Sequence, residues 1–88
     1  MNTSSEAIRL LEQAAAAARQ AAAVIDDLIA PHDYQDVAAL VTQAAAGLLE
    51  SATRLMQSDD VAGLEALEAA DDLLDAVYDI IESELDDE

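Results

Sequence analysis

The sequence contains no cysteine, phenylalanine or tryptophan, and it has one proline and two glycines. Without cysteine the chain forms neither a disulfide framework nor a thiolate-ligated metal site, and this absence is typical of a cytoplasmic protein. With two tyrosines as the only aromatic residues, the core must come from Leu, Ile, Val and Met side chains, each worth about 1.5–3 kcal/mol when buried. A chain of 88 residues therefore makes one small domain of marginal stability, for which self-association is an open possibility.

Basic residues are also scarce, since three Lys and Arg stand against 20 Asp and Glu, for a net charge of −17. Such a charge argues against binding nucleic acid or an anionic membrane and favours a basic partner. The alternative is that the acidity serves only solubility. Long apolar runs are missing as well, so we expect no membrane span. Glu6 precedes the first arginine, which does not fit a signal peptide.

Apolar residues recur with helical spacing and predict helices at about 4–30, 34–57 and 60–85, within one domain, 1–88. Thr3 and Glu6 form a capping box before the first helix. Pro31 should end that helix near residue 30, and Asp33 should cap the second. Ser58-Asp59-Asp60 is the second turn, and residues 86–88 are expected to fray. The prediction is an all-α fold, an antiparallel three-helix bundle (up-down-up), with dimerisation left open.

One apolar row on each helix is expected to face the core. Gly47 interrupts the second helix at a cost near 1 kcal/mol, which indicates either close packing against the alanine-rich middle of the first helix or a bend. The predicted inward rows are Ile8, Leu11, Ala15, Ala18, Ala22, Ile25 and Ile29; Val37, Val41, Ala44, Leu48 and Leu55; and Leu64, Leu67, Ala70, Leu74, Val77, Ile81 and Leu85.

The opposite side of the third helix carries the strongest functional signal. Seven carboxylates alternate at spacings of three and four, which places them on one helix face. Like charges at these spacings destabilise a helix by a few tenths of a kcal/mol per pair, and acids in the last turn oppose the helix dipole. Helix stability therefore does not explain this acidic row, which consists of Glu65, Glu68, Asp72, Asp75, Asp79, Glu82 and Asp86. Asp71 widens it, and we predict that these eight residues bind a partner.

No pattern of residues indicates catalysis. The single histidine, His32, lies beside Pro31 and reads as a solvated turn residue. The serines are predicted to be helix caps, and no general base lies at a spacing that could activate one of them as a nucleophile. The inward rows contain no carboxylate whose pKa burial could tune for acid–base work. Neither a Glu-x-x-His pattern nor a calcium loop occurs. We therefore expect no enzyme activity, no cofactor and no metal.

In size, charge and helical character the chain resembles the small acidic nucleic-acid mimics of phages and mobile elements, including some anti-CRISPR proteins. This resemblance covers overall character and assigns a role to no residue. It implies a protein that occupies the basic surface of a nucleic-acid-binding protein and inhibits it, with no direct contact to nucleic acid or membrane. The alternative is an acidic homodimeric adaptor or chaperone that docks through an apolar helix face.

Overall fold

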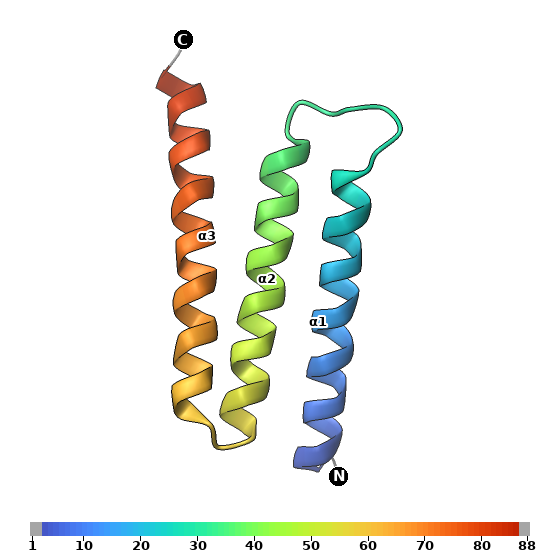
Figure 1. Ribbon diagram of the computed structural model, residues 1–88, viewed down its shortest axis with the longest axis vertical. Coiled ribbons are helices and arrows are strands. Elements are labelled where there is room, and N and C mark those ends of the chain that lie inside the picture. The colour runs from blue at the N-terminus through green and yellow to red at the C-terminus, as the bar shows by residue number, and fades with distance from the viewer. Residues whose placement is uncertain (1–2, 87–88) are drawn as a thin grey trace.

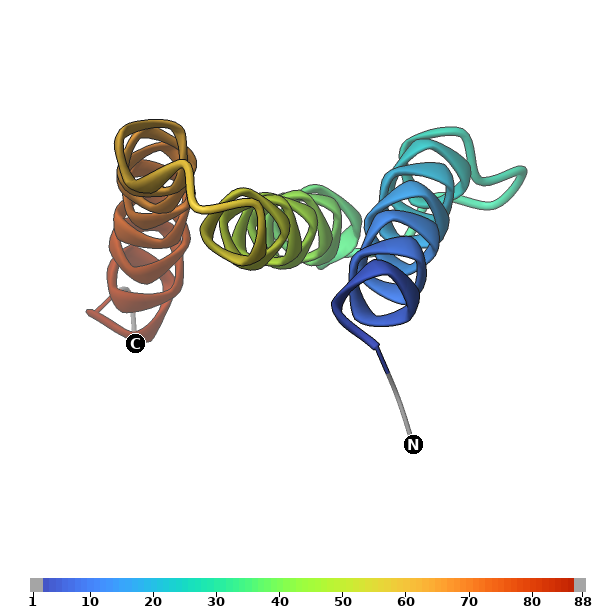
Figure 2. The ribbon, with the colours of Figure 1, turned by 90° about the horizontal axis from the view of Figure 1, so that it is seen from below.

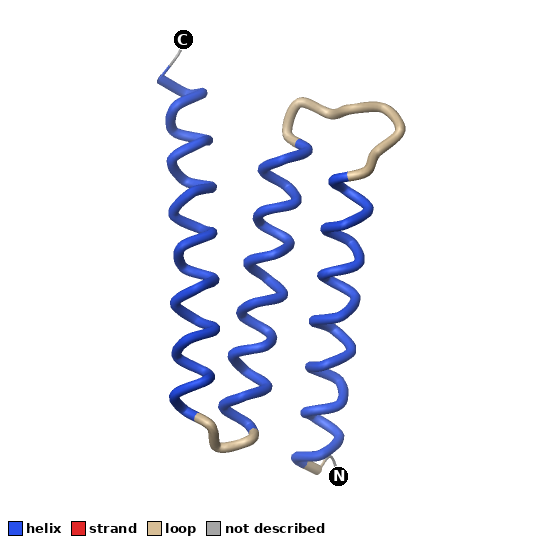
Figure 3. Tube along the Cα trace, in the orientation of Figure 1, coloured by secondary structure: helices blue, strands red, loops and turns tan. Residues whose placement is uncertain are grey.

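The computed structural model describes residues 3–86 and contains three helices, α1 (Ser4–Asp26), α2 (Gln35–Met56) and α3 (Asp60–Asp86). The chain runs up, down and up through them, and no strand occurs in the described part (Figures 1 and 3). The predicted all-α antiparallel arrangement is confirmed.

The starts of α1 and α3 and the turn between α2 and α3 form where the sequence predicts them. The Thr3 hydroxyl oxygen accepts a hydrogen bond from the Glu6 backbone N–H at 3.1 Å, which caps α1. Asp59 caps α3 in the same way, because its carboxylate accepts from the Ala62 N–H at 3.1 Å. Ser58 adopts φ 62°, the left-handed conformation that commonly follows the end of a helix. The turn between α2 and α3 is therefore short and fixed at both sides.

The first connection differs from the prediction. α1 ends at Asp26 rather than near residue 30. Its last turn carries an acidic residue and no basic one, which opposes the helix dipole. Asp33 is not the cap of α2 either, since Tyr34 occupies that position without a side-chain cap. Instead, the Gln35 amide nitrogen donates to the Asp26 carbonyl oxygen at 3.1 Å and joins the two helix ends directly.

At the C-terminus, α3 continues to Asp86, which was expected to fray. Asp87 and Glu88, which were also expected to fray, lie outside the described residues.

The three helices form a single layer with α2 in the middle. α1 and α3 each pack along α2, and within residues 3–86 they make no contact with each other. Figure 2 shows this layer of helices end-on, with α1 and α3 on either side of α2. The Cα atoms extend over 51 × 28 × 20 Å. Each helix consequently buries only the strip that faces its neighbour.

Small residues make both helix contacts. The buried apolar residues are alanines and one valine: Ala15, Ala22, Ala39, Ala44, Ala46, Ala70 and Val77. Gly47 is explained by close packing, but against α3 rather than α1, because a Cβ built on it would lie 3.3 Å from the Ala70 Cβ. Nearby, the buried Ser51 hydroxyl donates to the Gly63 carbonyl oxygen at 2.7 Å. α2 and α3 thus approach closely along a seam of small side chains.

The prediction that the inward rows form the core is wrong for most of their larger side chains. A single layer has no second side to cover them, so they are exposed. The exposed members are Ile29, Val41, Leu48, Leu55, Leu64, Leu67, Ile81 and Leu85.

Candidate functional site

The acidic row lies along the edge of α3 that faces away from the rest of the protein. Ala70 and Val77 are buried against α2. Asp72 and Asp79 each follow one of these residues by two positions, or about 200° around a helix of 3.6 residues per turn. They therefore point away from α2. Because α3 is the outer helix of the layer, nothing else in the described chain covers this edge (Figure 1).

The exposure of the row agrees with this placement. All its members with described side chains are exposed, as is Asp71 beside them; they are Glu65, Glu68, Asp72, Asp75, Asp79 and Glu82. Asp86 ends α3, and its side chain lies outside the described part. Its place in the site thus stays a prediction from spacing.

No cation of the described chain neutralises the row. The ion pairs found in residues 3–86 join Arg19 of α1 to Glu50 of α2 at 2.8 Å and, within α2, Arg54 to Glu50 at 3.7 Å. Neither pair involves a residue of α3, and α3 contains no Lys or Arg. The carboxylates of the row are thus available to basic groups from outside.

The geometry of the row suits an extended partner rather than a single ion. From Glu65 to Asp86 the row spans about 31 Å at 1.5 Å per residue, along a helix 27 residues long. In the described part of the chain, no group of three or more His, Asp or Glu residues converges as metal ligands do. A surface of separated negative charges is complementary to a set of basic side chains with a similar spacing.

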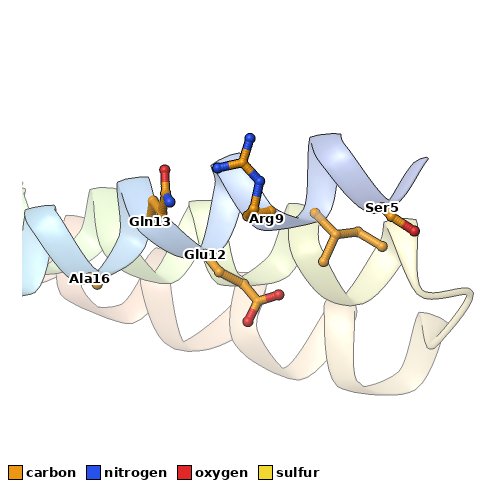
Figure 4. Close-up of a pocket in the computed structure, with 6 residues that line it drawn as sticks. Ser5, Arg9, Glu12, Gln13 and Ala16 are labelled. Atoms are coloured by element: carbon orange, nitrogen blue, oxygen red, sulfur yellow. The ribbon is translucent and has the colours of Figure 1, made fainter. Parts of the chain in front are cut away.

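The depressions on the surface lie elsewhere. One of about 450 Å³ involves residues of α1 alone, including Arg9, Glu12 and Gln13 (Figure 4), so no second helix closes it. Another, of about 470 Å³, crosses all three helices and includes Asp26, Gln43 and Leu73. Neither contains a residue of the acidic row.

The sequence did not reveal the Arg19–Glu50–Arg54 cluster as a unit. Glu50 and Arg54 are four residues apart on α2, a spacing that indicates an ion pair. Arg19, however, comes from α1, 31 residues earlier. Its pairing with Glu50 depends on how α1 and α2 align.

None of the described helices has the length and apolar character needed to cross a membrane. Comparison with protein-family models, curated proteins and solved structures finds no match.

Proposed function

We propose that the protein is a non-enzymatic acidic inhibitor that occupies the basic surface of a nucleic-acid-binding protein. The acidic row provides the binding surface, and Asp71 extends it. The observation that carries this proposal is the position of the row: exposed carboxylates follow the outer edge of α3, with no basic side chain of the described chain beside them.

The dimensions of the row fit the role of a nucleic-acid mimic. One turn of duplex DNA is about 34 Å long and carries a phosphate every ~3.4 Å of each strand. The row covers a similar length with one carboxylate per about 5 Å, calculated from the helical rise, and Asp71 reduces the spacing locally. Carboxylates form charge-assisted hydrogen bonds with the same Arg and Lys side chains that hold phosphates. Binding would therefore compete directly with nucleic acid, in the cytoplasm where we expect the protein to act.

The energetic argument supports a binding role. The like-charge pairs along α3 destabilise the helix that carries them. A surface that weakens its own helix is more readily explained by a partner that neutralises it than by folding.

The test uses two variants of equal net charge. The row-reversed variant carries Asp72→Lys, Asp75→Lys and Asp79→Lys. The charge-matched control carries Asp26→Lys, Asp27→Lys and Asp33→Lys, three exposed acids at the connection between α1 and α2. Each protein is immobilised and exposed to extract from its native cell, and the retained proteins are identified by mass spectrometry.

We expect the native chain and the control to retain a basic nucleic-acid-binding protein that the row-reversed variant loses. The purified partner should release a fluorescent duplex or single strand when the native chain is added. If the row-reversed variant retains the same partner, or if the nucleic acid stays bound, the proposal is wrong.

A second candidate function is an acidic homodimeric adaptor that docks through apolar side chains. The exposure of Leu48, Leu55 and Leu67 favours it. The two functions are distinguished by where substitutions impair partner binding, either in the acidic row or at these leucines.

A further inference from the structure

One broad side of the helical layer carries charged and polar side chains from α1 and α2. The depression that crosses the three helices places Asp26 of α1, Gln43 of α2 and Leu73 of α3 on the same side. The ion pairs of Glu50 with Arg19 and Arg54 lie on this side of α2 as well, since Glu50 follows Gln43 by seven residues, or two turns.

The opposite broad side is apolar. Val41 and Leu48 lie two positions from Gln43 and Glu50, which turns them about 200° away from the polar side. On α1, Val24 follows the buried Ala22 by two positions, so it points away from α2 along the outer edge of α1 and does not belong to this side. On α3, Leu67 and Tyr78 are rotated by more than 100° from Leu73. We define the apolar face by these four residues, Val41, Leu48, Leu67 and Tyr78, which are 40–60% exposed.

The exposed area is larger than a folded monomer of this size should have. A 9.2 kDa chain is expected to expose about 4,900 Å², whereas this chain exposes 6198 Å². Its radius of gyration is 15.3 Å, against about 12 Å expected for a compact domain of this length. The surplus of about 1,300 Å² exceeds the roughly 800 Å² that each partner contributes to a standard stable interface.

A second copy of this chain fits the face in both chemistry and shape. Within the described helices, the α2 part of the face carries no charged side chain, whereas Asp71 lies between Leu67 and Tyr78 on the α3 part. The acidic row points away from α2, so a basic partner would be attracted to a different surface. A two-fold contact pairs the face with itself and gives each of its apolar side chains an apolar neighbour.

We propose that two copies of the chain associate through their apolar faces and form a two-layer, six-helix dimer. The polar sides then lie outward, and each acidic row stays on an outer edge. The dimer supplies the core that one layer lacks. The strong negative charge of both copies opposes the contact, but salt screens this repulsion over about 8 Å at 0.15 M ionic strength. Association should therefore strengthen with salt.

The test measures molecular mass by sedimentation equilibrium from 1 to 100 µM protein, in low and high salt. The native chain should reach twice 9.2 kDa, at lower concentration when salt is added. Val41→Gln with Leu48→Gln should raise the dissociation constant by roughly a hundredfold or more, because each apolar side chain loses its burial. Ile29→Gln with Val61→Gln is the matched control, since both residues are exposed but lie outside the face.

Circular dichroism checks that each variant remains helical. If the Val41→Gln, Leu48→Gln variant unfolds, Leu67→Gln with Tyr78→Gln tests the α3 part of the face. The midpoint of thermal unfolding of the native chain should also rise with protein concentration, as it does for linked dimers.

A native mass of one chain at 100 µM in high salt would overturn the proposal and leave the face to another occupant. A dimer that the face variants preserve, or that the control breaks, would also overturn it. This outcome is separable from the proposed function, because salt strengthens the dimer and weakens binding through the acidic row.

Discussion

Reversal of charge in the acidic row should stabilise the protein while it removes the proposed binding surface. In the row-reversed variant, three like-charge pairs become opposite-charge pairs: Glu68 with residue 72, Asp71 with residue 75, and Glu82 with residue 79. A like-charge pair costs about 0.2–0.5 kcal/mol and an opposite pair contributes a similar amount, so each exchange is worth about 0.4–1 kcal/mol. The pairs 72–75 and 75–79 stay repulsive. The expected gain in unfolding free energy from charge is about 1–3 kcal/mol.

Thermal unfolding followed by circular dichroism measures this gain at one fixed protein concentration. For a domain of this length, 1 kcal/mol corresponds to about 4–8 °C in Tm. Lysine is also a better helix former than aspartate, and a variant with Gln at positions 72, 75 and 79 measures that contribution separately. The difference between the Lys and Gln variants should largely disappear in 1 M salt, where the Debye length falls to about 3 Å.

The charge-matched control separates the row from the total charge. The control also removes Asp26 from the last turn of α1, where an acid opposes the helix dipole at a cost of about 0.3–1 kcal/mol. If the control matches the row-reversed variant beyond this contribution, general repulsion is the cause rather than the row. If the row-reversed variant is less stable than the native chain, the carboxylates serve the fold and the argument for a binding role fails.

Two further predictions concern the seam between α2 and α3. Gly47→Leu should destabilise the protein by about 1–3 kcal/mol, measured by urea unfolding, because even a Cβ at this position lies 3.3 Å from the Ala70 Cβ; stability equal to the native chain would mean that the seam is loose. Ser51→Ala should cost about 1 kcal/mol in the same assay through loss of the hydrogen bond to the Gly63 carbonyl oxygen, and a change below 0.3 kcal/mol would show that this bond contributes nothing.

The sequence predicted the local structure well where local chemistry decides it. Thr3 caps α1 because a hydroxyl reaches the third N–H of the helix, and the turn at residues 58–60 forms where it was expected. The acidic row is exposed because its spacing places it opposite the buried positions of the same helix. These features depend on neighbours within a few residues.

The arrangement of the helices depends on contacts that the spacing does not specify. An apolar row shows which side of a helix avoids water, but not whether another helix covers it. Leu64 and Leu85 follow the same row as the buried Ala70 and Val77, yet they are 54% and 66% exposed, since α3 has a neighbour on one side only. Gly47 likewise indicated close helix packing, but it did not show that α3 is the neighbouring helix. The apolar face was therefore not predictable as one surface.

The most direct test of the binding role is the affinity of the captured partner as a function of salt. Isothermal titration at 50, 150 and 300 mM salt should show binding by the native chain that weakens steeply as salt rises, because the contacts are exposed charge pairs. The charge-matched control should behave like the native chain, and the row-reversed variant should show no measurable binding. Equal affinity of the native and row-reversed proteins, unchanged by salt, would contradict the role of the acidic row.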